Sequence, residues 1–319
     1  MPKVDTQDQI FPFLLRKVTE QAALASYSWI GRGQKEKGDA AAVAAMRQAL
    51  KDLNLNGMVV IGEGEKDQAP QLYNGEVFGD KEGVNQVDIA VDPVEGTTYL
   101  VKGLTNAMAT IAISERGKIF DPGPAFYMEK FAGPAELRGR INMEWSVQKK
   151  LTTSAELLKK EIQALTVFVL DKPRHRGLVE SIYEAGARVL LYPAGDVAGA
   201  LMAAIPDTEV DLLMGTGGTP EGVLCACAIR AMGGEFMGRI DPQLPTEIVR
   251  IREAGMDTTR WYDRDELIGS DEVHFCATGI TSGLLFDGII KTNHYFKSQT
   301  LIINGSNKEL MMLTNWLRV

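Results

Sequence analysis

The second half of the chain alternates short apolar runs with stretches of helical periodicity. The apolar runs predict buried strands at TVFVL (166–170), RVLLYPA (188–194) and VDLLMG (210–215). The periodic stretches predict helices at AELLKKEIQAL (155–165), GLVESIYEAG (177–186), DVAGALMAAI (196–205) and EGVLCACAIRAMGG (221–234). Regular alternation of this kind is typical of a layered α/β region whose sheet is partly parallel.

The first half shows a different order of elements. Helical spacing predicts helices over 12–30 and 39–53, and Asp39 is expected to open the second. Strands are predicted at MVVIGEGE (58–65) and VDIAVD (87–92), followed by a hairpin over 108–120 that turns at Arg116 and Gly117. The chain shows no internal repeat and no low-complexity linker. We therefore place a soft boundary near residue 150, between an α+β domain (1–150) and an α/β domain (151–319).

The stretch VDIAVDPVEGTT (87–98) begins as a buried strand and then turns polar. Pro93 has no amide hydrogen for a sheet ladder, so strand pairing is expected to stop there. Gly96 allows a close backbone approach. The interruption is expected to turn Asp92 and Glu95 toward the same place.

Composition narrows the classes of partner. The net charge of −8 argues against a protein that binds nucleic-acid backbones, and no apolar run is long enough to span a membrane. The N-terminus lacks the apolar core of a secretory signal, and the three cysteines form no disulfide framework. We therefore expect a cytoplasmic protein.

Carboxylates follow several of the predicted strands. Strand C-termini are where loops and ligands converge in α/β sheets, and clustered carboxylates repel one another unless a cation lies between them. Oxygen ligands of this kind suit Mg²⁺ or Mn²⁺. The alternative interpretation is that they are solvated loop residues. The acids in question are Glu63, Glu65, Asp67, Asp92, Glu95, Asp196 and Glu221, together with Asp39 at the start of a predicted helix.

Two further stretches favour a phosphate ligand. GTGGTPEGV (215–223) joins a strand to a helix, and its amides could hold a phosphate or a metal-bound oxygen. DKPRHRG (171–177) places Lys172, Arg174 and His175 after a strand, and lysine and arginine are the residues that grip phosphate. Taken alone, GTGGTPEGV is explained at least as well by a tight strand-to-helix turn, and DKPRHRG is explained better by a solvated helix start. Taken with the carboxylates and the hydroxyl of Thr97, they indicate metal-assisted hydrolysis of a phosphate ester.

The chain also resembles the class II fructose-1,6-bisphosphatases. The resemblance rests on VTEQAALAS, VVIGEGE, VDIAVDPVEGT, FYMEK, KPRH, GDVAGA, GGTPEGV and ATGIT, in order from about residue 16 to about residue 305. The inositol monophosphatases share a weaker pair of motifs, which appear in this chain as IGE and DPVEGTT. The resemblance implies a layered α/β/α/β/α sugar-phosphatase fold with two mixed sheets. It further implies a metal-binding N-terminal domain, a substrate-binding C-terminal domain, and a homo-oligomer (dimer or tetramer).

The resemblance also implies roles for individual residues. The implied activity is release of the 1-phosphate of fructose 1,6-bisphosphate with Mn²⁺ or Mg²⁺. Catalytic roles fall to Thr97, Asp67 and Lys35. The implied metal ligands are Asp39, Glu63, Asp92, Glu95 and Glu221. The substrate contacts are Glu95, Gly96, Thr97, Tyr127, Lys172, Arg174, Asp196 and Gly218.

Several residues differ from those that the family commonly has, and the differences bear mainly on how the sugar would be bound. Ala194 stands where the family commonly has an aspartate, Ala125 replaces another aspartate, Thr98 replaces an arginine or asparagine, and Ala40 follows the ligand Asp39. The metal set is intact, so catalysis is better supported than the identity of the sugar. Alternatives are another sugar bisphosphate such as sedoheptulose 1,7-bisphosphate, an inositol phosphate, or a catalytically idle sugar-phosphate sensor.

Overall fold

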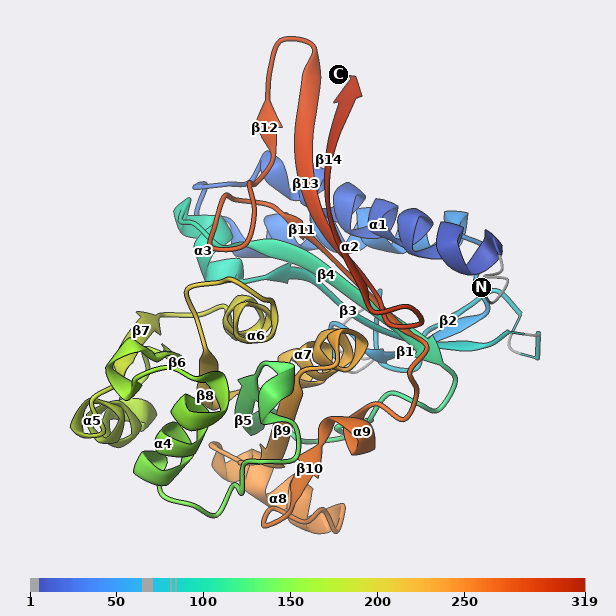
Figure 1. The fold of residues 1–319 in the computed structure, drawn as a ribbon. Helices are drawn as coiled ribbons and strands as arrows, with labels where there is room; N and C mark the ends of the chain where they lie inside the picture. Colours follow the sequence, from blue (N-terminus) through green and yellow to red (C-terminus); the bar gives the residue numbers. More distant parts are fainter. Residues whose placement is uncertain (1–5, 65–70, 81, 84, 319) are drawn as a thin grey trace. The chain divides into compact units, whose positions relative to one another are not determined.

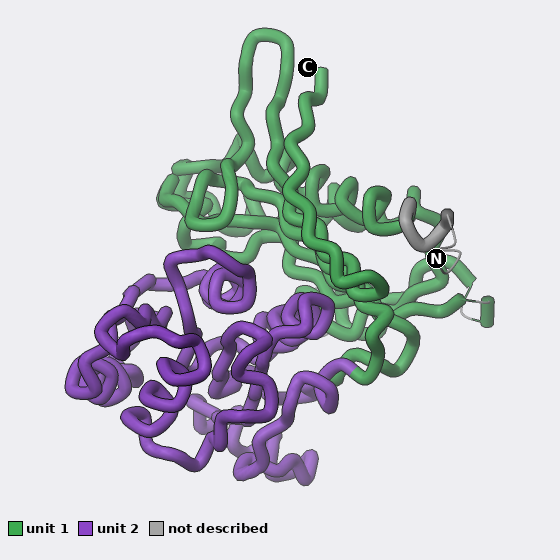
Figure 2. Tube along the Cα trace, viewed as in Figure 1, with its two compact units in different colours: residues 1–120, 269–319 green, residues 121–268 purple. Residues whose placement is uncertain are grey.

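The computed structural model describes residues 6–64, 71–80, 82–83 and 85–318. The chain forms two compact units, drawn in different colours in Figure 2. Unit 1 comprises residues 1–120 and 269–319, and unit 2 comprises residues 121–268. This division differs from the boundary expected near residue 150, because strand pairing over long sequence distances sets it.

Unit 1 contains a mixed eight-stranded sheet in the order β12-β13-β11-β4-β3-β1-β2, with β14 paired to β13 (Figure 1). Strands β1 and β3 run parallel, and the other pairs are antiparallel. The strands are β1 (Gly57–Ile61), β2 (Val77–Phe78), β3 (Val87–Glu95), β4 (Met108–Glu115), β11 (Val273–Gly279), β12 (Ile290–Lys291), β13 (Tyr295–Asn304) and β14 (Glu309–Arg318). Because β11 pairs with β4, the C-terminal segment belongs to the first sheet.

Helices α1 (Thr6–Tyr27) and α2 (Lys35–Asp52) pack against each other and against this sheet. Leu15, Val18 and Ala22 of α1 recur at spacings of three and four and are fully buried, as the helical periodicity requires. The hydroxyl of Thr19 lies 2.7 Å from that of Thr278 on β11, which satisfies two buried polar groups together. A short helix, α3 (Thr97–Lys102), follows β3.

Unit 2 contains a mixed six-stranded sheet in the order β10-β9-β5-β8-β6-β7. Strand β6 is parallel to β7 and β8, whereas β5 is antiparallel to β8 and β9. The strands are β5 (Tyr127–Gly133), β6 (Thr166–Leu170), β7 (Arg188–Tyr192), β8 (Leu212–Gly218), β9 (Glu235–Ile240) and β10 (Trp261–Asp263). The pairing of β5 with β8 and β9 is what brings residues 121–150 into this unit.

Helices cover both faces of the second sheet. Val167 and Val169 of β6 face a core shared with α4 and α5, while Phe168 faces Gly199 of α6 so closely that a Cβ there would overlap the ring. The helices are α4 (Val147–Leu158), α5 (Arg176–Glu184), α6 (Asp196–Ala204), α7 (Thr219–Met232), α8 (Pro245–Glu253) and α9 (Arg264–Leu267), with single turns η1 (Ala135–Leu137), η2 (Ile162–Ala164) and η3 (Pro173–His175). Both sheets are mixed, which confirms the expected α/β class.

Several local predictions were wrong. The second helix begins at Lys35, so Asp39 lies one turn inside it and does not open it. The predicted hairpin over 108–120 does not form: β4 ends at Glu115 and pairs with β3 and β11. The helix expected over 155–165 lies earlier, at 147–158, because the side chain of Ser146 accepts from the amide of Lys149 and caps its start. Among the described residues, no helix combines the length and apolar character needed to cross a bilayer.

Candidate active site

The C-terminal ends of the parallel strands β1 and β3 bring acidic residues to one edge of the unit 1 sheet. Ile61 of β1 is paired with Ala90 of β3. Glu63 follows Ile61 by two residues, just beyond the end of β1, and Asp92 follows Ala90 by two residues on β3. Two carboxylates from separate segments therefore come to the same edge, where ligands bind in sheets of this kind.

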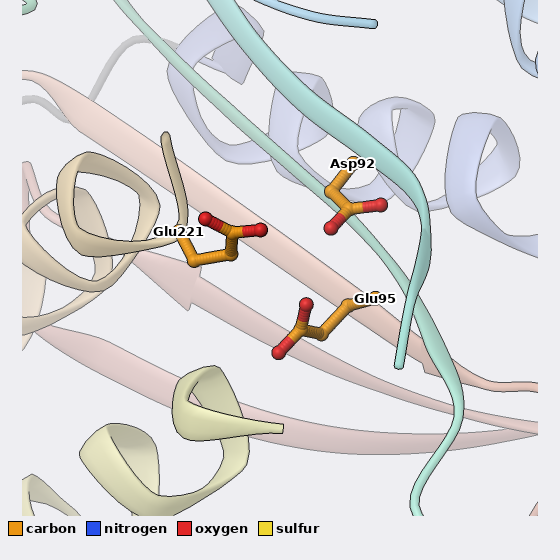
Figure 3. A group of neighbouring side chains, drawn as sticks. All are labelled: Asp92, Glu95 and Glu221. Carbon is orange, nitrogen blue, oxygen red and sulfur yellow. The ribbon is translucent and has the colours of Figure 1, made fainter. Parts of the chain in front are cut away.

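The Asp-Pro-Val-Glu-Gly segment holds its two acids close together. The β3–β4 ladder shifts register between Asp92 and Glu95, so pairing breaks at Pro93 but resumes at Glu95, which corrects the expectation that it would stop. Asp92 Oδ1 accepts a hydrogen bond of 3.0 Å from the amide of Val94. A carboxylate oxygen of Asp92 lies within 4.8 Å of one from the buried Glu95. Figure 3 shows both side chains extending from this segment.

Gly96 and Thr97 form the start of α3, directly after the two acids. Gly96 has a left-handed backbone (φ 78°), and a Cβ there would lie 2.7 Å from the ring of Tyr99. The residue type is therefore set by backbone strain and by space together. Thr97 Oγ1 donates to the carbonyl of Val94 at 3.2 Å, so its hydrogen is held by the backbone and the oxygen can still accept a hydrogen bond.

Lys35 and Asp39 lie one turn apart on α2. Gly38, next to Asp39, packs so tightly that a Cβ would come 3.0 Å from Leu100 of α3, so this part of α2 lies against the helix that carries Thr97. Burial raises the pKa of Asp39, and the nearby Lys35 opposes that shift. A cation beside this half-buried side chain would stabilise its negatively charged form. Glu65 and Asp67 lie outside the described residues.

Unit 2 gathers its candidate residues at one edge of its own sheet. Strands β6, β7 and β8 are parallel, so the segments after them lie at a common edge. Tyr127 begins the antiparallel strand β5 and is paired with Gly218 at the end of β8. The residues brought to this edge are Tyr127, Lys172, Arg174, Ala194, Asp196, Gly218 and Glu221.

Arg174 is oriented by its neighbours. Its Nε and Nη2 atoms donate to the carbonyl of Thr216 at 3.1 and 2.7 Å. Its guanidinium lies 5.2 Å from the ring centroid of Tyr127. These contacts fix the plane of the guanidinium while the side chain as a whole stays exposed. An arginine held in this way is prepared for an anionic group, because less side-chain entropy remains to be lost on binding.

His175 joins the end of β6 to β8. Its Nδ1 donates to the carbonyl of Leu170 at 2.7 Å, and its Nε2 accepts from the amide of Thr216 at 2.8 Å. One nitrogen donates and the other accepts, so the ring is neutral. Burial lowers the pKa of His175, and the positive charge of Arg174 acts in the same direction. The imidazole is therefore a hydrogen-bonding support for the Arg174 loop.

The neutral state of His175 predicts a pH dependence of stability. Its folded-state pKa is below the unfolded value of about 6.5, so this contribution is complete above that pH and declines as the pH falls below it. We expect the unfolding midpoint in urea to decrease between about pH 7.5 and about pH 5.5, with a slope of at most about 1.4 kcal/mol per pH unit from this group. His175→Asn should reduce that slope. An equal slope in both proteins would contradict the assignment.

Lys130, which was not among the residues expected from the sequence, lies beside the candidate residues of the unit 2 edge. This side chain on β5 is only 2% exposed and forms an ion pair with Asp196 at the start of α6. Burial lowers the pKa of Lys130, but the charges of Asp196 and Glu221 outweigh that effect and the net direction is upward, so the ammonium is retained. The FYMEK motif contained the signal: strand alternation puts Lys130 on the same face as Met128, facing the interior.

Glu221 occupies the first turn of α7, next to this ion pair. Burial raises its pKa, as does the charge of Asp196, while Lys130 opposes both. A Cβ at Gly218 would overlap its carboxylate, and a Cβ at Gly217 would overlap that of Asp196. Glycine is therefore needed at both positions to leave room for the two carboxylates. Figure 3 shows the Glu221 side chain at the start of its helix.

The donor set suits a hard divalent cation. Within unit 1, Asp92 and Glu95 offer oxygens close together, and burial of Glu95 makes the two negative charges costly without a cation. In unit 2, the buried Oε2 of Glu221 has no hydrogen-bond partner among the residues that the structure describes. Carboxylate oxygens without thiol or imidazole ligands favour Mg²⁺ or Mn²⁺.

Known proteins resemble this chain over most of its length. The family model described as bacterial fructose-1,6-bisphosphatase, glpX-encoded, matches residues 11–316. A D-fructose 1,6-bisphosphatase class 2/sedoheptulose 1,7-bisphosphatase of Crocosphaera subtropica is 39% identical over 316 residues, covering 92% of this chain and 91% of its own length. Fructose-1,6-bisphosphatase 1 class 2 of Escherichia coli is 40% identical over 307 residues, with coverage of 92% and 91%. Among solved structures, an extragenic suppressor from Pyrococcus furiosus aligns with a TM-score of 0.34 and 13% identity over 61% of this chain and 72% of that one.

Proposed function

The chain belongs to the family of bacterial, glpX-encoded fructose-1,6-bisphosphatases, and we propose that it hydrolyses the 1-phosphate of fructose 1,6-bisphosphate to give fructose 6-phosphate and phosphate. The observation that carries this proposal is the pair of sheet edges. One presents carboxylates and a hydroxyl for metal-assisted chemistry, and the other presents an oriented arginine beside a buried Lys130–Asp196 pair.

We assign Mn²⁺ or Mg²⁺ binding to acids of both units. The proposed ligands are Asp39, Glu63, Asp92, Glu95 and Glu221. A bound divalent ion would supply Lewis-acid stabilisation of charge on the phosphoryl oxygens and lower the pKa of a bound water.

Thr97, Lys35 and Asp67 are proposed to act on the attacking water and the transferring phosphoryl group. In the structure the Thr97 hydroxyl donates to Val94, so its oxygen is left to accept a hydrogen bond from the attacking water and to orient that water. Lys35 is exposed on α2, one turn before the ligand Asp39, and can place a positive charge near the phosphoryl oxygens. Glu95 and Gly96 are assigned to the same phosphoryl group.

The unit 2 edge is proposed to bind the rest of the substrate. Lys172 and Arg174 would hold the phosphate that is not hydrolysed, with Tyr127 beside them. Asp196 would accept a sugar hydroxyl while Lys130 holds its other carboxylate oxygen in place. Gly218 lets the backbone approach the ligand where a side chain would collide with Glu221.

The role of the cationic residues predicts a difference between substrates. We expect Lys172→Ala and Arg174→Ala to raise the KM for a sugar bisphosphate more than that for a sugar monophosphate, since only the bisphosphate offers a second anion. A hydrogen bond to a charged group contributes about 1.5–3 kcal/mol, which corresponds to a KM change of roughly tenfold or more. Initial-rate kinetics on both substrates measure it. Arg176→Ala, which changes an exposed arginine two residues after Arg174, is the control. Equal losses on the two substrates in Lys172→Ala and Arg174→Ala would contradict the assignment.

A second candidate substrate is sedoheptulose 1,7-bisphosphate. It is favoured by the second activity in the name of the Crocosphaera subtropica relative and by Ala194, which stands two residues before Asp196 at the proposed sugar-binding edge. A phosphate-release screen of the purified protein, with and without Mn²⁺, on both bisphosphates and on an inositol phosphate tests the proposal. Release from neither bisphosphate would overturn it, and sugar binding without release would favour the idle sensor.

We also propose a cytoplasmic location. The three cysteines, Cys225, Cys227 and Cys276, are free and buried, as is typical of a protein from a reducing compartment. Burial raises the pKa of the Cys276 thiol, which makes it unreactive. Fractionation of the producing cell with an antibody to the chain measures the location.

A further inference from the structure

Glu247 is a fully buried acid in the first turn of α8. Its carboxylate accepts four hydrogen bonds, all from backbone amides. Oε2 accepts from the amides of Gln243 and Leu244 at 3.0 and 3.4 Å, which caps its own helix. Oε1 accepts from the amides of Phe126 and Tyr127 at 2.6 and 2.8 Å. One carboxylate thus joins the start of α8 to the start of β5.

Capping of α8 does not require the two contacts to β5. Helix α9 begins in the same way, with Glu266 at the equivalent position accepting from the amide of Asp263 at 3.0 Å. The other oxygen of Glu266 forms an ion pair with Arg260 at the surface. In Glu247 the corresponding oxygen is turned to the two amides of β5 instead. The extra contacts therefore serve the segment that contains Tyr127.

Tyr127 belongs to a closed set of contacts around Arg174. The guanidinium of Arg174 lies 5.2 Å from the centroid of the Tyr127 ring and donates to the carbonyl of Thr216. The hydroxyl of Thr216 donates to Asp241 at 2.5 Å, and the amide of Asp241 donates to the carbonyl of Tyr127 at 3.0 Å. Glu247 joins this set through the amide of Tyr127. A displacement of Tyr127 would therefore be passed on to the guanidinium.

We propose that Glu247 is a positioning residue for the phosphate that is not hydrolysed. It fixes the place of Tyr127, and the Tyr127 ring in turn holds the plane of the Arg174 guanidinium. A guanidinium binds phosphate through parallel hydrogen bonds, so its affinity depends on that plane. This role rests on the proposed function of Arg174, because Glu247 is buried and acts only through its neighbours.

The test measures the affinity of the full chain for fructose 6-phosphate, which carries only the phosphate that is not hydrolysed, by calorimetric titration with Mn²⁺ present. Two variants weaken the Glu247 contacts in different ways. Glu247→Gln replaces one acceptor oxygen with an NH₂ group, so only one of the two pairs of amides keeps an acceptor. Glu247→Asp shortens the reach from α8 to β5. We expect each to bind the sugar phosphate roughly fivefold or more weakly, because Arg174 and Tyr127 must then be ordered on binding.

A double-mutant cycle separates positioning from a general loss of stability. In an Arg174→Ala background, Glu247→Gln and Glu247→Asp should each weaken binding by less than about twofold, which is the usual error of additivity. The reason is that the side chain that Glu247 positions is then gone. Asp211→Asn is the matched control and should keep the wild-type affinity. This buried acid accepts from the amide of Thr166 at 2.9 Å, at the opposite end of β6 from the Arg174 loop.

The outcomes distinguish the role of Glu247 from the proposed function itself. If Arg174→Ala binds fructose 6-phosphate as tightly as the wild type, the assignment of the phosphate to Arg174 fails, and the role of Glu247 fails with it. If Arg174→Ala binds weakly and the Glu247 variants do not, only the role of Glu247 is wrong. An equal effect of the Glu247 variants in both backgrounds, or loss of the wild-type circular dichroism spectrum in both variants, would make Glu247 a residue of the fold and overturn the proposal.

Discussion

Asp92→Asn should abolish most of the turnover while leaving the protein folded. The change keeps the shape of the side chain, including an Oδ1 that can still accept from the amide of Val94, but removes the negative charge proposed to bind the metal. A bound metal stabilises the transition state by several kcal/mol, and each 1.36 kcal/mol corresponds to about tenfold in rate. We expect a loss in kcat of at least about 10²-fold on this basis.

Two measurements check the result. Phosphate release at saturating Mn²⁺ gives the rate, and calorimetric titration of the protein with Mn²⁺ gives the affinity without any dependence on turnover. Glu221→Gln should behave in the same way, since its buried Oε2 is proposed as a metal ligand. Asp52→Asn, at an exposed acid near the end of α2, is the matched control and should match the wild type. Near-normal activity and Mn²⁺ affinity in Asp92→Asn would rule out the metal site.

Thr97→Ala should lower kcat far more than it raises KM. The hydrogen of Thr97 is held by the carbonyl of Val94, so the hydroxyl can contact the attacking water only as an acceptor, and alanine removes that acceptor. Orientation of a water and transfer of its proton are typically worth about 10²–10⁴-fold. Steady-state kinetics on fructose 1,6-bisphosphate separate the two constants.

The conservative variant decides between a chemical and a structural role. Thr97→Ser keeps the hydroxyl and should retain most of the kcat, whereas Thr98→Ala alters an exposed neighbour and should change little. An increase in KM alone for Thr97→Ala would make this residue a substrate contact. Loss of activity in Thr97→Ser to the level of the alanine variant would mean that the methyl group, and hence packing of α3, is what matters.

Local sequence was sufficient for the elements that carry the site. The runs TVFVL, RVLLY and DIAV are strands where apolar pattern predicted them, because short buried strands need little context. Gly96 before Thr97 marked a backbone turn for a similar reason, since its positive φ is a property of that one residue. Acids that follow such strands could therefore be placed at sheet edges from the chain alone.

Pairing between distant segments could not be obtained in this way. The pairing of β5 with β8 and of β11 with β4 decides which residues belong to each unit, and neither pairing has a local signal in the residues concerned. Pro93 was expected to end its strand, but the bulge absorbs the missing amide and pairing resumes at Glu95.

Lys130 shows the same limit in a single side chain. Its sequence neighbours indicate a strand, yet a lysine on a strand is most often exposed, and burial depends on a counter-charge. That counter-charge is Asp196, which lies sixty-six residues later and faces Lys130 only because α6 packs on the sheet that contains β5. Strands and local turns thus follow from hydrophobic pattern and short-range sterics. The partner of a buried charge depends instead on contacts that form when the whole unit folds.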